Sequence, residues 1–226
     1  MSSQIKKKIY LIGTNPYDIS DCTIQAIKKI ELSDSVILSK KFCREYLELI
    51  CDRNIYFQED LSENNDVNLW IEILKIIKNN NVVSHLVHGD PNIDNNGNEE
   101  LFFFKKQKVQ CEIIPGIIKV INHMNINSSL LTNREKNFSA TFLKRFNKKK
   151  ISEIIKKSYF EKLVIFLENQ SQLKYVLHLL DQYSSKRQIT LSLFSDKSFL
   201  QNIKFTKMIE NCDYPSYIVI ESNEKI

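Results

Sequence analysis

The chain has 226 residues, of which 42% are hydrophobic, and carries a formal net charge of +5. It contains only 4 Gly and 4 Pro, where average usage would give about 16 and 11. This composition excludes collagen-like, Pro-rich and Gly/Ser-linker chains. The hydrophobic share is large enough to bury a core, which excludes a disordered chain.

Charge and cysteine content limit which partners and which cellular compartment the sequence is compatible with. Short basic runs at residues 6–8, 105–108 and 148–150 lack interleaved aromatic residues, so we expect a solvated surface and no nucleic-acid partner. The 5 cysteines contain no CxxC pair, which favours reduced thiols over a disulfide framework or a metal site. No apolar stretch approaches the ~18 residues of a membrane span, and we recognise no signal peptide. We therefore expect a cytoplasmic protein without a membrane partner.

The first half of the chain alternates short Ile/Val-rich runs with helical periodicity. The pattern predicts strands at residues 8–13, 35–38, 82–87 and 111–114. It predicts helices at residues 23–32, 66–78 and 99–106, with a polar loop over residues 90–98.

The pattern restarts after about residue 125, with strands predicted at residues 163–167, 188–193 and 217–220 and a helix at 171–183. Strands that alternate with helices indicate an α/β fold. The polar segment 122–129 is the candidate boundary, giving an N-terminal α/β domain over residues 1–122 and a C-terminal one over 123–226.

All 4 glycines lie in three short segments, and each segment follows a predicted strand. They are Gly13 after the first strand, Gly89 and Gly97 around the polar loop, and Gly116 after the strand that ends near residue 114. Ligands of open α/β sheets bind outside the carboxyl ends of the strands, and glycine lets a backbone approach a ligand closely. The placement predicts a shared ligand site.

Two other patterns are weak. Gly13, Asn15 and Asp18 fall on the frame of a dinucleotide fingerprint, but only one of the three is Gly, so an NAD site is poorly supported. His85 and His88 would point to opposite faces of a strand, so we expect one core histidine and one at a loop edge, with no metal site.

Eight segments, taken in order, carry a resemblance: IYLIGTNPYD at 9–18, LVHGDP at 86–91, GNEE at 97–100, EIIPGI at 112–117, LTNR at 131–134, SATF at 139–142, LVIFL at 163–167 and PSYIVI at 215–220. Together they resemble the motifs of the tetrapyrrole methylase family. The LTNR and SATF segments are similar to those of family members that methylate uroporphyrinogen III.

The resemblance implies two α/β domains with a ligand cleft between them, a homodimer, and S-adenosyl-L-methionine as methyl donor. It implies C-methylation of uroporphyrinogen III to precorrin-2, on the way to sirohaem and cobalamin. Such a transfer mainly needs donor and ring carbon to be aligned, together with a base for the departing proton.

Roles are carried over position by position. Asp18, the acid retained in the first loop, is the expected proton-handling residue. Thr132 and Arg134 are expected at the substrate carboxylates, for which an arginine is well suited. The remaining matched positions are expected to bind the donor: Gly13, Pro16, Gly89, Asp90, Ile93, Pro115 and Gly116.

Several family glycines are replaced in the same segments. Asn15, Tyr17 and His88 stand at glycine positions, and Asp94 stands at a phenylalanine position. Two further interpretations therefore stay open beside methylation of uroporphyrinogen III. One is another precorrin methyltransferase, and the other is a family member that has lost catalysis.

Overall fold

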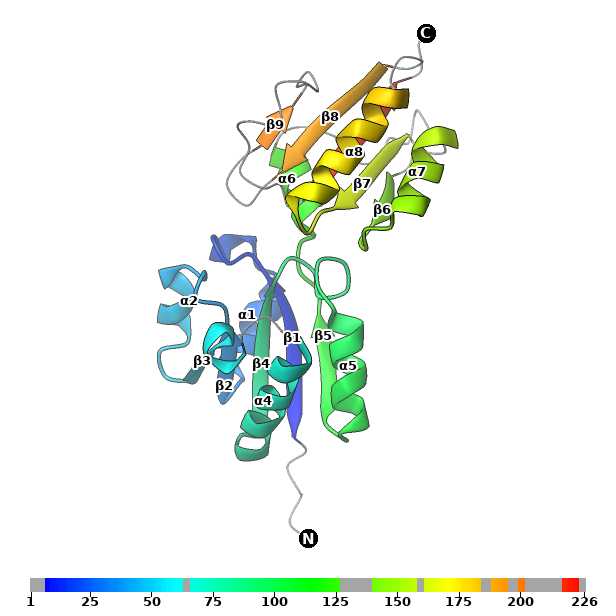
Figure 1. Ribbon diagram of the computed structural model, residues 1–226. Coiled ribbons are helices and arrows are strands. Elements are labelled where there is room, and N and C mark those ends of the chain that lie inside the picture. Colours follow the sequence, from blue (N-terminus) through cyan, green and yellow to red (C-terminus); the bar gives the residue numbers. More distant parts are fainter. Residues whose placement is uncertain are drawn as a thin grey trace. The chain divides into compact units, whose positions relative to one another are not determined.

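The computed structural model describes residues 7–62, 66–126, 140–157, 161–183, 188–194, 199–201 and 217–223. The chain divides into two compact units, Met1–Lys119 and Val120–Ile226 (Figure 1). Each unit contains one five-stranded sheet with helices packed on it. The fold is therefore α/β in both units, as predicted.

The sheet of the first unit has the strand order β3-β2-β4-β1-β5, and every pairing in it is parallel. Its strands are β1 (Lys8–Thr14), β2 (Ser35–Leu38), β3 (Asn54–Phe57), β4 (Val82–His88) and β5 (Gln110–Ile114). All carboxyl ends of a parallel sheet lie at one edge. The four strands predicted for this unit are confirmed, and β3 is additional.

Helices cover both faces of this sheet, and the central strands β1, β2 and β4 are therefore buried on both sides. Ile9 and Leu11 of β1 belong to one core cluster with the helices at residues 66–79 and 97–106, whereas Tyr10 and Ile12 belong to the other. This alternation follows from the two-residue period of a strand. The helical elements are η1 (Ile19–Asp21), α1 (Ile24–Glu31), α2 (Arg44–Leu49), α3 (Gln58–Leu61), α4 (Asp66–Asn79) and α5 (Gly97–Lys106).

The second unit has a mixed sheet of order β6-β7-β10-β8-β9. Within it β6 and β7 are parallel, whereas β10 runs antiparallel to both of its neighbours. The strands are β6 (Ala140–Leu143), β7 (Lys162–Phe166), β8 (Gln188–Phe194), β9 (Phe199–Gln201) and β10 (Tyr217–Asn223), and the helices are α7 (Lys148–Lys157) and α8 (Gln170–Tyr183). Helix α6 (Lys119–Ile126) begins at the last residue of the first unit and continues into the second. Residue 122, after which the sequence placed the domain boundary, lies inside α6.

A single apolar cluster holds the second unit together. Leu173, Val176 and Leu180 of α8 pack in it with Ile151 and Ile155 of α7. The sequence prediction found α8 but missed α7, whose two buried residues are spaced i, i+4 between lysines. That spacing is typical of an amphipathic helix. It was overlooked because most of the ten residues of α7 are charged. Helices α2 and α3 were missed because each is less than two turns long.

Candidate functional site

Three loops begin at the carboxyl edge of neighbouring strands in the first unit. They follow β1, β4 and β5, and β1 is the central strand of the three. In the register, Gly13 of β1 pairs with Val87 of β4, and Ile12 pairs with Ile114 of β5. The prediction that the three glycine-bearing segments follow strands is therefore confirmed, and the strand order places them side by side.

Three glycines bring these loops into direct backbone contact. A Cβ atom built on Gly13 would lie 2.4 Å from the Gly89 carbonyl oxygen and 2.5 Å from the Gly116 nitrogen. A Cβ on Gly116 would lie 2.3 Å from the same carbonyl. Separations below 3.0 Å do not occur for real Cβ atoms, so each position has to be glycine. Gly89 also adopts a φ of 80°, which favours glycine.

Helix α2 holds the loop after β1. The Tyr46 hydroxyl donates to the Asn15 carbonyl at 2.9 Å, and the Cys43 N–H donates to the Pro16 carbonyl at 2.7 Å. Tyr46 is fully buried, which raises the pKa of its phenol. Cys22 shares the hydroxyl at 2.7 Å. Tyr46 could not be predicted as part of the site, because its partner Asn15 lies 31 residues away in the sequence and no local pattern links the two.

Asp18 lies at the surface and caps the short helix η1. Its Oδ1 accepts from the Ser20 hydroxyl at 2.6 Å and from the Ser20 N–H at 2.8 Å. These hydrogen bonds hold the pKa of the Asp18 carboxyl below its usual range. The group is therefore ionised at neutral pH and intrinsically a weak base. Its expected role in proton handling stays a prediction.

The loop after β4 is shaped by its own polar side chains. Asp90 is buried, and its Oδ1 accepts from the N–H groups of Asn92 and Ile93 at 2.9 and 3.2 Å. The Asn95 amide donates to the His88 carbonyl at 2.8 Å. The bonds to Asp90 are turn-forming bonds of the Asx type, and the Asn95 bond reaches back across the loop to the last residue of β4. They let a loop with few glycines keep a fixed backbone.

Asp94 joins the loop after β4 to the loop after β5. Its Oδ2 accepts from the Asp90 N–H at 2.7 Å and from the Lys119 N–H at 3.2 Å. Its Oδ1 is buried without a hydrogen-bond partner, and burial raises the pKa of this carboxyl. Sequence analysis noted Asp94 only as a departure from the family pattern.

Two side chains that stand at family glycine positions meet each other. The rings of Tyr17 and His88 pack edge to face, with centroids 5.6 Å apart. Tyr17 is 44% exposed. The two residues that stand in place of family glycines, Tyr17 and His88, thus form an aromatic pair beside the strand ends. No sequence signal couples the two positions.

His85 lies in the core below these loops, as predicted for one of the two histidines. Its Nδ1 lies 2.7 Å from a Glu100 carboxylate oxygen, and its Nε2 lies 2.8 Å from the Gln58 amide nitrogen. Since Gln58 donates there, Nε2 accepts and Nδ1 carries the proton toward Glu100. Across the described parts of the chain, no group of three His, Cys, Asp or Glu could hold a metal ion.

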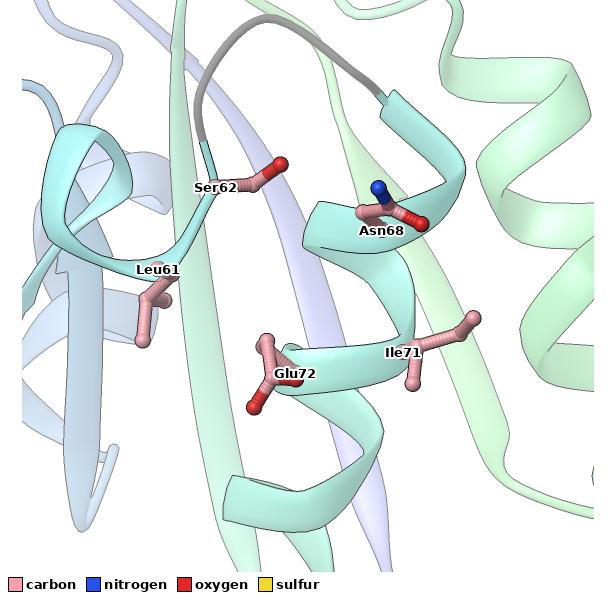
Figure 2. A pocket seen from close by; sticks show the side chains of 5 residues that line it. All are labelled: Leu61, Ser62, Asn68, Ile71 and Glu72. Carbon is pink, nitrogen blue, oxygen red and sulfur yellow. The ribbon is translucent and has the colours of Figure 1, made fainter.

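A hollow of about 350 Å³ lies elsewhere, between α3 and the first turns of α4 (Figure 2). Leu61, Ser62, Asn68, Ile71 and Glu72 line it, and none of the predicted site residues is among them. Glu72 is paired with Lys75 at 2.6 Å. This hollow therefore adds no group to the candidate site.

The structure brings together the glycines of the three loops but leaves part of the prediction aside. Gly13, Gly89 and Gly116 meet, and Asp90 lies buried in the loop that Gly89 opens. Thr132 and Arg134, expected to bind substrate, lie outside the described residues. Four cysteines are free thiols: Cys22, Cys43, Cys51 and Cys111. None of the described helices is long and apolar enough to span a membrane.

Fold and site together define an α/β protein whose three glycine-bearing loops lie at the carboxyl edge of a parallel sheet. A sequence model of the tetrapyrrole (corrin/porphyrin) methylases matches residues 8–192. The chain belongs to this family.

The chain is similar to the uroporphyrinogen-III C-methyltransferase of Priestia megaterium, with 28% identity over 141 residues, 60% of this chain and 58% of that protein. The matches cover 31–58% of the length of the first curated relatives.

Two solved structures show the same fold. Uroporphyrin-III C-methyltransferase of Thermus thermophilus, complexed with S-adenosyl homocysteine, has a TM-score of 0.70 at 16% identity, covering 95% of this chain and 97% of that one. A cobalt precorrin-4 methyltransferase has a TM-score of 0.69 at 16% identity, covering 95% and 94%.

Proposed function

We propose that this protein transfers a methyl group from S-adenosyl-L-methionine to carbon atoms of uroporphyrinogen III, giving precorrin-2. The observation that carries the proposal is the meeting of three family motifs at one sheet edge, through Gly13, Gly89 and Gly116. The Priestia megaterium relative supports this substrate. The donor supplies an already activated methyl group, so the protein has mainly to align the reactants.

The residues at this edge fit such a donor. The backbone of the loop after β4 is held by the buried Asp90, whose Oδ1 accepts the N–H groups of Asn92 and Ile93. We propose that the donor is held by the matched loop positions Gly13, Pro16, Gly89, Asp90, Ile93, Pro115 and Gly116.

Binding of the donor is the first test. We expect isothermal titration calorimetry to show binding of S-adenosyl-L-methionine and of S-adenosyl homocysteine. No heat for either at millimolar concentration would contradict the methyltransferase proposal. It would favour the family member that has lost catalysis, for which the Tyr17–His88 pair at two glycine positions is the supporting observation.

The substrate is the second test. We expect uroporphyrinogen III, incubated with the donor under anaerobic conditions, to gain two methyl groups by mass spectrometry. Donor binding without this gain would favour another precorrin methyltransferase, which the likeness to a cobalt precorrin-4 methyltransferase keeps open. Growth of a sirohaem-deficient bacterium without cysteine would then separate the two in cells.

Asp18 is the proposed proton-handling residue, with Thr132 and Arg134 proposed at the substrate carboxylates. Asp18→Asn keeps an acceptor for Ser20 but removes the negative charge. We expect it to lower turnover while leaving donor affinity unchanged. Unchanged turnover would remove Asp18 from the mechanism.

We also propose that the protein is cytoplasmic and forms a homodimer. Light scattering coupled to size exclusion would test the homodimer by its mass.

A further inference from the structure

Asp94 connects the two loops that meet at Gly89 and Gly116. Its Oδ2 accepts the N–H of Asp90, inside the loop after β4, and the N–H of Lys119, the first residue of α6. These are backbone donors from segments 29 positions apart in the chain, taking 119 minus 90. The bond to Lys119 also places a negative charge at the N-terminus of α6, where it is favourable.

The same side chain fills the space that a Cβ atom on Gly89 would need. A Cβ atom on Gly89 would lie 2.1 Å from Asp94 Oδ2, and Gly89 holds a φ of 80°. The Gly89 N–H donates to the Thr14 carbonyl at 2.7 Å, and its carbonyl lies against Gly13 and Gly116. The Asp94 carboxylate therefore lies beside the backbone of Gly89, whose carbonyl faces the other two loops.

Burial of the Asp94 carboxylate in this contact costs desolvation free energy. Its Oδ1 is buried without a hydrogen-bond partner, and burial of the carboxylate outweighs its two backbone bonds, so its pKa is raised. The charged groups facing it are Asp90 and Lys119.

We propose that Asp94 is a positioning residue for the methyl donor, because its carboxylate fastens the loop after β4 to the start of α6 and so fixes the backbone of Gly89 and Asp90. The inference rests on the proposed function for the donor. It assigns Asp94 no contact with the donor, and no family motif supplies it, since the matched family position is phenylalanine.

The matched control is Asp34, which makes the same kind of contact at the opposite end of the strand. One oxygen of Asp34, Oδ2, accepts the N–H groups of Asn81 and Val82 at 3.0 and 2.9 Å, where β4 begins. Asp34→Ala therefore removes a two-bond carboxylate clamp far from the candidate site. Any loss of donor affinity caused only by lost stability would appear in this variant as well.

The test measures donor affinity by calorimetry for Asp94→Ala, Asp94→Asn and Asp34→Ala. We expect Asp94→Ala to weaken S-adenosyl homocysteine and S-adenosyl-L-methionine equally, by about tenfold, which corresponds to about 1.4 kcal/mol. Asp94→Asn, which keeps one acceptor oxygen, should lose less, and Asp34→Ala should stay within about twofold. Unchanged affinity in Asp94→Ala would overturn the proposal. So would a loss confined to the cationic donor, which would indicate direct charge recognition.

Hydrogen exchange without ligand separates this inference from the proposed function. We expect the amides of Asp90 and Lys119 to exchange faster in Asp94→Ala, while those of Asn81 and Val82 respond only in Asp34→Ala. If the unaltered protein binds neither donor nor product, the proposed function fails together with the donor part of the inference. The exchange pattern then still decides whether the clamp exists, and an unchanged rate at both amides overturns it.

Discussion

The two units are both α/β, and among the described residues the loop contact through glycines lies in the first. Its sheet is entirely parallel, whereas the second has antiparallel pairs on both sides of β10. A parallel sheet directs all strand ends to one edge, and an antiparallel pair directs them to opposite edges. All 4 glycines lie in the first unit, three of them in the loop contact. Sheet direction therefore determines where a glycine-dependent site can form.

The largest effect should come from the core of the second unit. Leu180 is fully buried in its apolar cluster, and Leu180→Ala should lower the free energy of unfolding by about 2–5 kcal/mol. Leu32, which is 65% exposed, is the matched control, expected to change by about 0.5 kcal/mol at most. Urea unfolding measures both. Hydrogen exchange should show the loss in β7 and β10, and equal loss in β1 and β4 would break the comparison between units.

Next in size is an added methyl group at the loop contact. Gly116→Ala would place a Cβ 2.3 Å from the Gly89 carbonyl oxygen, and backbone cannot move as a side chain does. We expect a loss of about 3 kcal/mol, the upper part of the range for overpacking, and loss of donor binding. Lys149→Ala, on the exposed side of α7, is the control. Unfolding like that of the parent protein would show that the three loops are not in contact.

A smaller effect is expected at the hydroxyl that anchors the first loop. Tyr46→Phe removes the bond to the Asn15 carbonyl and should cost about 1 kcal/mol. Tyr175→Phe is the counterpart in the second unit, where the hydroxyl donates to the Lys148 carbonyl at 3.1 Å on the surface. Only Tyr46→Phe should also weaken donor binding. If both variants leave donor affinity unchanged, α2 does not position the first loop for the ligand.

The smallest effect concerns pH and Asp94. Burial raises the pKa of this carboxyl in the folded state, so the folded protein binds the proton more readily than the unfolded chain. The stability that Asp94 contributes is therefore complete below the ordinary Asp range and is lost as pH rises through the folded pKa. Relative to Asp94→Asn, the unfolding free energy should fall with pH in that window, by at most about 1.4 kcal/mol per pH unit. A rise would mean that the carboxylate is net stabilising.

Local patterns predicted seven of the strands and the two longest helices, α4 and α8, but missed β3, β6, β9 and α7 and gave no contacts between distant segments. Strand 35–38 was predicted with its bounds from the short apolar run Val36–Leu38, and the structure buries all four of its residues, as expected for a covered strand. Helix α2 was missed, and with it Tyr46, whose partner Asn15 lies 31 residues away. The importance of Asp94 was missed as well, since a polar residue in a polar loop gives no signal until its partners are known.

The sequence by itself determined the α/β class, the family and the positions of the glycine-bearing segments after their strands. It did so because strand period, helix period and glycine placement are local properties of the chain. Only the tertiary structure decided that Gly13, Gly89 and Gly116 touch, that Tyr17 meets His88, and that Asp94 spans two loops. The physical reason is that strand order, β4-β1-β5, is set by burial over the whole sheet.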